Sequence, residues 1–234
     1  MVETKNPDGS WNECTGTIIS SRHILTAAHC IIGFKIIKDT MADIQIIIQK
    51  EEIVVRINSQ NINEISSLKL VKIQEAFIHY NYNTEVATND LTILEAVEPF
   101  FPNIEPIKLS NYFDYEPGQS VLEMGFGDHF GKNIVITDED PLIASEYLRQ
   151  VQSYLHSIQI CREMWPFTIS DTHLCVGSPN AGIGPGDSGG PLLIKGQDEN
   201  WYQIGVASFG ENRPLSPELR AQYLTVVKNV WSNQ

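Results

Sequence analysis

The amino-acid sequence predicts an all-β fold, and three observations support this. Short runs of β-branched and aliphatic residues recur along the chain, glycine and proline separate them, and helical periodicity is scarce. Many short strands joined by such turns are typical of barrels or of a sandwich. The strand candidates are residues 44–48, 53–57, 68–73, 120–124, 191–194 and 202–207.

Other segments have different patterns. The first ten residues read as a turn, with Pro7-Asp8-Gly9 as the strongest signal. Residues 99–106 contain three prolines, and we interpret them as a linker that crosses between two halves of the chain. The apolar spacing of residues 226–231 suits a short helix packed on the body.

The length of the chain, 234 residues, would fit one large all-β domain or two small ones.

Composition narrows the class of protein. Hydrophobic residues make up 42% and charged residues 19% of the 234 residues, which indicates a folded chain. The formal net charge of -13 repels phosphate backbones and anionic lipid, so we expect neither nucleic acid nor a membrane as partner. We find no apolar run of about 18 residues, and the first residues lack the apolar centre of a secretory signal.

The four cysteines suggest two disulfides and an oxidising compartment. Three pairings are formally open, and four buried free thiols are the alternative. The cysteines lack C-x-x-C spacing, Glu51-Glu52 reads as a charged strand end, and the remaining histidines share no ligand-like spacing with carboxylates. We therefore predict no metal and no cofactor. These histidines are His23, His79, His129, His156 and His173.

A glycine-rich segment, Gly186-Asp187-Ser188-Gly189-Gly190-Pro191, has the composition of a nucleophile turn. A serine hydroxyl needs a base to accept its proton and donors to stabilise the developing oxyanion. The glycines permit a tight turn, in which the backbone N–H groups of Gly186 and Ser188 can converge on one point. Taken alone, such a turn is often only a loop.

Two further segments contain candidate partners for this serine. His29 lies in Leu-Thr-Ala-Ala-His-Cys, where small neighbours let its ring rest against backbone. Asp90 precedes the apolar run Leu-Thr-Ile-Leu. Each of these residues alone has a plain structural reading, as a packed histidine or as the start of a strand.

Together, in the order His, Asp, Ser, the three segments resemble the trypsin/chymotrypsin-like serine proteases. The TAAHC box of that family stands at residues 26–30, its D-[IL]-x-[IL]-L strand at 90–94 and its GDSGGP box at 186–191. The resemblance runs from about Trp11 to the C-terminus. Around His29 the sequence is similar to that of invertebrate, trypsin-like members of the family. Lipases and esterases are excluded because their order along the chain is Ser, Asp, His.

The resemblance implies a fold. It implies one peptidase domain of two six-stranded antiparallel Greek-key barrels with a short C-terminal helix. Residues 1–105 would form the barrel that carries His29 and Asp90, and residues 106–234 the barrel that carries Ser188. The catalytic cleft would lie between them. Family pairing would join Cys14 with Cys30 and Cys161 with Cys175.

The resemblance also implies roles. His29 would act as general base and then as general acid, Asp90 would hold its ring, and Ser188 would form the acyl-enzyme. Gly186 and Ser188 would supply the oxyanion hole. Ser208 matches the serine that supports the triad aspartate, and residues 208–210 resemble the strand that pairs with substrate backbone.

One departure from the family concerns activation. Family enzymes are zymogens, in which cleavage frees an I-V-G-G-type N-terminus whose ammonium pairs with the aspartate before the nucleophile, here Asp187. Such a motif does not precede Cys14 in this sequence, and the first strand of the first barrel is expected to be missing. Since a buried carboxylate without a partner is costly, the chain reads as incomplete, as zymogen-like or as a homologue that no longer cuts.

A second departure concerns specificity. The pocket-floor position matches Gly182 rather than an acidic residue, so a Lys or Arg side chain would lack a charge partner. Gly184 stands where the family often has a cysteine that ties this pocket. We expect an apolar P1 preference. The expected pocket residues are Gly182, Ile183, Pro185, Phe209, Gly210 and Ala221.

Two functions follow as hypotheses. The first is a secreted, monomeric serine endopeptidase that acts on proteins or peptides and meets protein protease inhibitors. The second is a non-catalytic homologue that binds or regulates on the same scaffold. The intact His29, Asp90 and Ser188 favour the first.

Overall fold

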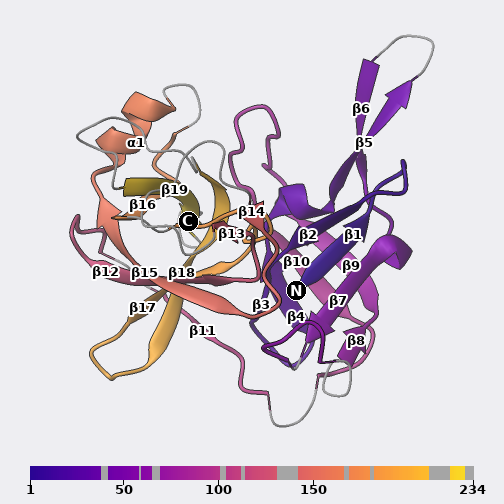
Figure 1. Cartoon of the computed structure of the whole chain (residues 1–234), viewed down its shortest axis with the longest axis horizontal. Helices are drawn as coiled ribbons and strands as arrows, with labels where there is room; N and C mark the ends of the chain where they lie inside the picture. The colour runs from indigo at the N-terminus through magenta and orange to yellow at the C-terminus, as the bar shows by residue number, and fades with distance from the viewer. Residues whose placement is uncertain are drawn as a thin grey trace.

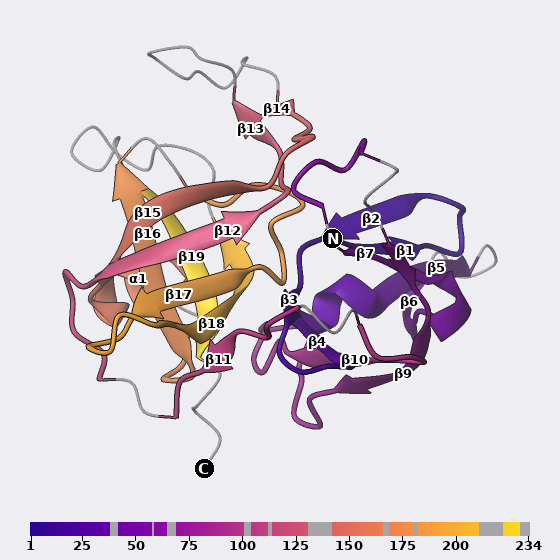
Figure 2. The same cartoon turned by 90° about the horizontal axis from the view of Figure 1, so that it is seen from below.

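The computed structural model describes residues 1–37, 42–57, 59–64, 69–100, 104–111, 114–130, 142–165, 169–179, 182–210 and 222–229. Within these ranges the chain forms two β lobes that lie side by side (Figures 1 and 2). The strands up to residue 96 build the first lobe, and those from residue 108 onward build the second. These two lobes match the predicted pair of β-barrels.

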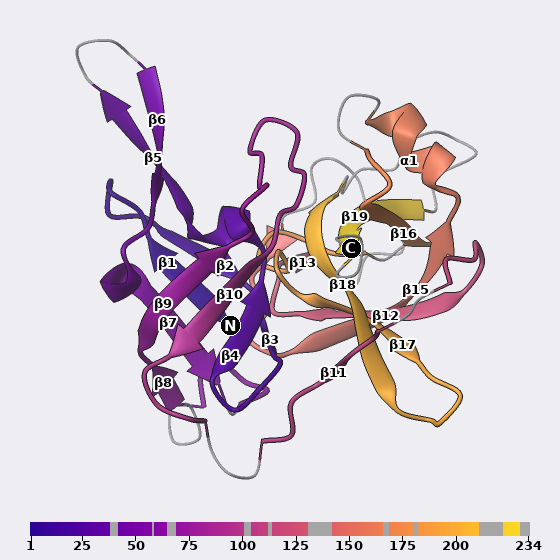
Figure 3. The same ribbon diagram turned by 180° about the vertical axis from the view of Figure 1, so that it is seen from behind.

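The first lobe contains two four-stranded sheets, of order β2-β1-β7-β8 and β3-β4-β10-β9, and the β5-β6 hairpin, which projects from the lobe (Figure 3). Short 3₁₀ helices cover residues Ala28–Ile31 and Lys50–Glu52. The strands are β1 Val2–Lys5, β2 Trp11–Cys14, β3 Thr17–Ile18, β4 His23–Thr26, β5 Ile32–Ile37, β6 Ala42–Ile47, β7 Ile53–Ile57, β8 Lys69–Val71, β9 Ile73–Ile78 and β10 Thr92–Ala96.

Alternating side chains from both sheets fill the first core. In β7, Ile53, Val55 and Ile57 point inward, as the period of a half-buried strand requires. Val55 and Leu94, from opposite sheets, belong to one buried cluster. Because the two sheets pack around this cluster, the end of β4 and the start of β10 are held in place. His29 follows β4 in the chain, and Asp90 precedes β10.

The expectation of a missing first strand was wrong. Val2–Lys5 forms β1, which pairs with β2 on one side and with β7 on the other. The turn predicted at Pro7-Asp8-Gly9 lies between β1 and β2 and makes them a hairpin. Val2 and Thr4 are buried, because tertiary pairing with β7 places them inward, which the local pattern alone did not reveal.

The second lobe is a closed barrel. Its seven-stranded sheet has the order β11-β18-β17-β12-β15-β16-β19, and a further pairing of β18 with β19 closes the ring. The strands are β11 Lys108–Leu109, β12 Ser120–Gly125, β13 His129–Phe130, β14 Leu142–Ile143, β15 Arg149–His156, β16 His173–Pro179, β17 Pro191–Lys195, β18 Trp201–Gly210 and β19 Gln222–Asn229. The helix α1 is Ile158–Met164.

The helix predicted for residues 226–231 was wrong where the structure describes it. Residues 226–229 belong to strand β19, which pairs with β16 and with β18. Two neighbouring strands from distant parts of the chain outweigh the local apolar spacing here. Residues 230–234 lie outside the described part of the chain. The described helix α1 begins instead after Ser157, whose side chain accepts the N–H of Gln159.

Two disulfides fasten the lobes internally. Cys14 is bonded to Cys30 in the first lobe, and Cys161 to Cys175 in the second. The first bridge joins the end of β2 to the 3₁₀ helix of His29. The second joins α1 to β16. This pairing is the one that the family resemblance implied.

Candidate active site

A buried carboxylate binds the histidine twice. Oδ1 of Asp90 accepts the backbone N–H of His29 at 2.8 Å, and Oδ2 lies 2.7 Å from the ring Nδ1. Asp90 is 1% exposed, whereas the His29 ring is partly open to solvent. Two-point attachment fixes both the backbone and the ring, which leaves Nε2 as the free nitrogen of the imidazole.

The local backbone explains how these residues meet. His29 lies in the 3₁₀ helix that follows β4, and Asp90 is separated only by Leu91 from β10, the partner of β4 in the sheet. Asn89 adopts a left-handed conformation with φ of 53°, which asparagine tolerates better than most residues. This turn brings the Asp90 side chain over the start of the 3₁₀ helix.

A third residue, from the second lobe, completes the chain of hydrogen bonds. The hydroxyl of Ser208 in β18 donates to Oδ2 of Asp90 at 2.6 Å. Asp90 therefore accepts hydrogen bonds from elements of both lobes. The site lies where the lobes meet.

The electrostatics follow from this geometry. Burial alone would lower the pKa of His29, but the charge and hydrogen bond of Asp90 outweigh it, so the pKa is raised above its usual value. Burial acts to raise the pKa of Asp90, but His29 and Ser208 hold it below its usual value. The pair therefore favours an ionised carboxylate that orients the imidazole and can stabilise an imidazolium.

The predicted nucleophile turn is tight, and glycine is required in it. Gly186 has φ of +93° and Gly189 has φ of +81°. A Cβ on Gly189 would lie 2.0 Å from Oγ1 of Thr26 and 2.4 Å from the carbonyl oxygen of Thr15. The turn is thus pressed against the first lobe, and the N–H of Thr15 donates to the carbonyl oxygen of Ser188 at 2.8 Å.

Hydrogen bonds orient the two peptides that carry the candidate oxyanion donors. The carbonyl oxygen of Pro185 accepts from Asp128 N–H at 2.7 Å, and that of Asp187 accepts from Gly190 N–H at 2.8 Å. Because C=O and N–H point in opposite directions in a trans peptide, these bonds direct the N–H groups of Gly186 and Ser188 away from their acceptors. Among the described residues, neither N–H group has a hydrogen-bond acceptor in the protein.

His29 and Ser188 lie against the same disulfide. Sγ of Cys30 is 4.0 Å from Nε2 of His29 and 3.8 Å from the carbonyl oxygen of Ser188. In the described part of the chain, Nε2 of His29 and Oγ of Ser188 share no hydrogen bond. Catalytic hydrogen bonds are often long in ligand-free structures and shorten when substrate binds.

The carboxylate of Asp187 is held by backbone. Oδ1 accepts from Gly127 N–H and Oδ2 from Gly184 N–H, each at 2.8 Å. Burial raises the pKa of Asp187, and these two hydrogen bonds act against that rise. Among the described residues we find no ion pair to Asp187, and the amino group of Met1 donates to Arg56 O at 3.1 Å.

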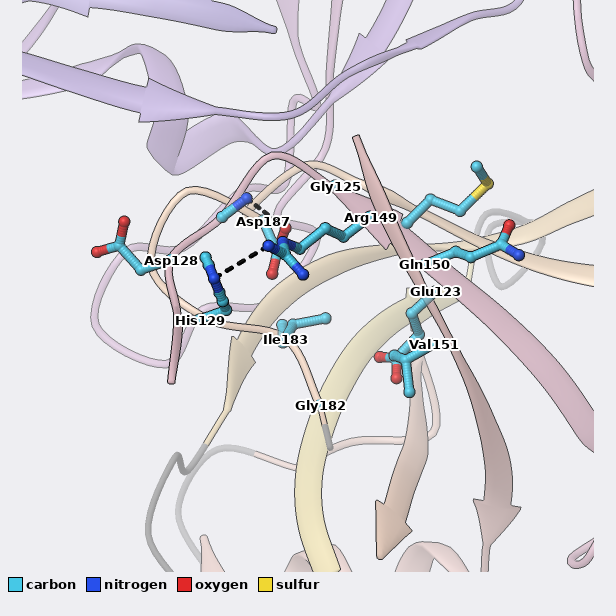
Figure 4. A pocket seen from close by; sticks show the side chains of 12 residues that line it. Glu123, Gly125, Asp128, His129, Arg149, Gln150, Val151, Gly182, Ile183 and Asp187 are labelled. Carbon is cyan, nitrogen blue, oxygen red and sulfur yellow. Dashed lines mark hydrogen bonds between the residues drawn. The ribbon is translucent and has the colours of Figure 1, made fainter. Parts of the chain in front are cut away.

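Asp187 opens onto a cavity of about 130 Å³ in the second lobe (Figure 4). Gly182 and Ile183, which the sequence placed in a substrate pocket, line this cavity together with Asp187. Pro185, another residue of the expected pocket, is exposed beside the nucleophile turn. Arg149 also lines the cavity, where its guanidinium lies 3.0 Å from Nε2 of His129.

The other expected pocket residues lie on β18 or outside the described residues. Phe209 packs edge-on against Trp165 and lies near the ring of His173. Gly210 ends β18. Ala221 lies outside the described ranges.

The sequence interpretation missed a buried carboxylate near Asp187. Glu123 of β12 is 3% exposed, and Ser153 donates to its Oε2. Burial is the main cause that raises the pKa of Glu123 to about 7. The signal was present: Val121 and Glu123 share the inward phase of β12, so the alternation pointed an acidic side chain into the core.

Metal binding at this site is disfavoured by the cysteine chemistry. Ligand atoms of Cys14, His29 and Cys30 lie within 4.8 Å of one another. Both sulfurs are bonded in the disulfide and cannot bind a metal as thiolates.

The described helices include none with the length and apolar character needed to cross a membrane.

The sequence is similar to those of known proteins. A family model described as Trypsin matches residues 1–230. A venom serine protease, Bi-VSP, of Bombus ignitus is 32% identical over 217 residues, which cover 85% of this chain and 52% of that protein. A venom protease of Bombus pensylvanicus is 28% identical over 223 residues, 90% of this chain and 79% of that protein. The chain thus spans about half the length of the first relative.

Proposed function

The chain belongs to the trypsin family of serine proteases, and on that premise we propose that it is a serine endopeptidase with Ser188 as nucleophile. The hydrogen-bonded series from Ser208 through Asp90 to His29 supports the proposal most strongly. This series leaves Nε2 of His29 as the proton acceptor, beside the turn that presents Ser188.

The proposed reaction uses these groups in sequence. Nε2 of His29 takes the proton from Ser188 Oγ as that oxygen attacks the scissile carbonyl carbon. The N–H groups of Gly186 and Ser188 donate to the oxyanion. The imidazolium then gives its proton to the leaving amine as the C–N bond breaks. Water, deprotonated by His29, hydrolyses the acyl-enzyme and restores Ser188.

We propose an apolar P1 preference. Gly182 supplies no carboxylate for a cationic side chain, and Ile183 adds apolar surface beside it. Phe209 belongs to residues 208–210 of β18, which are proposed to pair with substrate backbone, and its ring packs edge-on against Trp165. The acidic net charge still favours the approach of cationic proteins.

We propose that the protein is secreted and acts on proteins or peptides as a monomer. Two disulfides are favoured by an oxidising compartment. The relatives from Bombus are described as venom proteases, which agrees with secretion. Protein protease inhibitors are the expected further partners.

One observation favours a second function, that of a non-catalytic binding homologue. Within the described ranges, Asp187 has two backbone donors but no cationic partner. The charge of such a half-buried carboxylate is costly without a partner, and the family uses an ammonium at this aspartate. A partner that binds equally well to the Ser188→Ala variant would support this function.

Hydrolysis of fluorogenic peptides tests the enzyme proposal. A series with Phe, Leu, Ala, Lys or Arg at P1 should give the highest kcat/KM for Phe or Leu, and Ser188→Ala should abolish turnover of all of them. Higher kcat/KM for Lys or Arg would contradict the P1 preference while supporting the nucleophile. Turnover that persists in Ser188→Ala would contradict both.

A further inference from the structure

Thr15 joins three segments at the nucleophile turn. It lies between β2 and β3 of the first lobe and is 3% exposed. Its backbone N–H donates to Ser188 O, and its carbonyl oxygen accepts from the hydroxyl of Thr26 at 2.7 Å. These main-chain bonds hold Thr15 in place and leave its hydroxyl free to act on the second lobe.

The hydroxyl of Thr15 makes two hydrogen bonds to backbone of the second lobe. Oγ1 donates to the carbonyl oxygen of Gly186 at 3.0 Å and accepts from the N–H of Phe126 at 3.3 Å. A hydroxyl has one proton to donate and lone pairs to accept, so both bonds can exist together. The residue after Phe126, Gly127, donates to Asp187 at 2.8 Å. Thr15 therefore binds both segments that lie beside the Asp187 carboxylate, one at Phe126 and the other at Gly186.

The peptide that Thr15 holds is the link between the two candidate oxyanion donors. The carbonyl of Gly186 belongs to the peptide between Gly186 and Asp187. The N–H of Gly186 lies on one side of that peptide and the N–H of Ser188 on the other. Backbone N–H groups bind the flanking carbonyl oxygens of Pro185 and Asp187. Among the described contacts, the carbonyl oxygen of Gly186 is bound instead by a side chain, that of Thr15.

We propose that Thr15 is a positioning residue that fixes the oxyanion hole through its hydroxyl. The inference rests on the proposed endopeptidase function. Since the hydroxyl does not touch substrate, its loss should leave substrate binding nearly unchanged. It should weaken interactions made only in the transition state, when charge develops on the carbonyl oxygen.

Four variants of the full chain test this proposal. Thr15→Val replaces the hydroxyl with a methyl group of similar size, Thr15→Ala removes it without adding bulk, and Thr15→Ser keeps it. Thr17→Val is the matched control, because Oγ1 of Thr17 is buried without a hydrogen-bond partner among the described residues. Circular dichroism establishes which variants fold.

Thr15→Val and Thr15→Ala should lower kcat about tenfold and leave KM within about twofold, a fraction of the loss seen when an oxyanion donor is removed. Their affinity for a peptidyl boronate, which forms a tetrahedral adduct, should fall by the same factor. Thr15→Ser and Thr17→Val should retain wild-type values. Unchanged kcat in a folded Thr15→Val or Thr15→Ala variant, or equal loss in Thr15→Ser, would overturn the proposal.

Hydrogen exchange separates this proposal from the endopeptidase function. If the wild-type chain cleaves nothing, the function fails, but exchange of residues 184–190 still tests the hydroxyl. We expect about tenfold faster exchange there in folded Thr15→Val or Thr15→Ala than in Thr17→Val, because turn hydrogen bonds open more readily. Equal exchange in these variants would overturn the role of Thr15 whatever the activity. If neither Thr15→Val nor Thr15→Ala folds, the kcat of Thr15→Ser decides. A wild-type kcat in Thr15→Ser supports the role of the hydroxyl, and a lowered kcat overturns that role.

Discussion

Asp90 binds His29 with both carboxylate oxygens, one on the backbone N–H and the other on the ring. A single ring contact would allow the imidazole to rotate about its own bonds. The second contact fixes the backbone from which the ring extends. The buried carboxylate of Asp90 therefore both orients His29 and supplies the negative charge beside it. Ser208, from the opposite lobe, holds this carboxylate with a hydrogen bond.

Asp90→Asn should reduce kcat by about 10⁴-fold, as the equivalent change does in other proteases with a Ser-His-Asp triad. The amide keeps the shape but can present N–H to Nδ1, which favours the wrong tautomer of His29. Steady-state kinetics with the preferred peptide measure the effect. A loss below tenfold would mean that Asp90 does not orient the base.

The pH dependence of kcat/KM should report His29. The reaction needs the neutral imidazole, so the rate rises as pH increases through the pKa of His29 in the free enzyme. Because Asp90 raises this pKa above 6.5, the midpoint of the rise should lie above pH 6.5. In Asp90→Asn the charge is lost and burial acts alone, so the midpoint should move down. A wild-type midpoint below pH 6.5 would contradict the assignment.

Glu123→Gln should remove a pH-dependent loss of stability. The pKa of Glu123 is about 7 in the folded chain, whereas that of an ordinary glutamate side chain is 4.5, so the folded state binds more protons than the unfolded state between these pH values. The free energy of unfolding should therefore fall by about 3 kcal/mol as pH rises from 4 to 8. Urea unfolding at several pH values measures this.

The glutamine variant lacks the titrating group and should show a smaller fall over the same range. Glu51→Gln, at an exposed position, serves as the control and should follow the wild type. If wild type and Glu123→Gln lose stability in parallel, Glu123 is not the group responsible.

The sequence predicted strands where their patterns are local, as at residues 53–57 and 191–194. Ile53–Ile57 alternates in the sequence and in the structure, and the glycines at 186 and 189 signal the turn that their φ values require. Local signals failed where distant pairing decides. Residues 226–229 form a strand because β16 and β18 flank them, and Val2–Lys5 does so because β7 lies beside it.

The same reason explains which site residues the sequence did not reveal. His29, Asp90 and Ser188 were recognised from the boxes around them, which resemble a known family. Thr15 was not, because its hydroxyl bonds Gly186, a residue 171 positions away, and no local pattern encodes that contact. The family resemblance placed Gly182 and Ile183 in a substrate pocket, and in the structure both line the cavity onto which Asp187 opens, so their role in substrate binding stays a prediction.

Labelling with a peptidyl organophosphonate, read by mass spectrometry of the intact chain and its peptides, tests the proposed nucleophile most directly. We predict one adduct per chain, located on Ser188, and strongly slowed labelling in His29→Ala. An adduct that persists in Ser188→Ala, or a folded wild-type chain that remains unlabelled, would contradict the proposal that His29 activates Ser188.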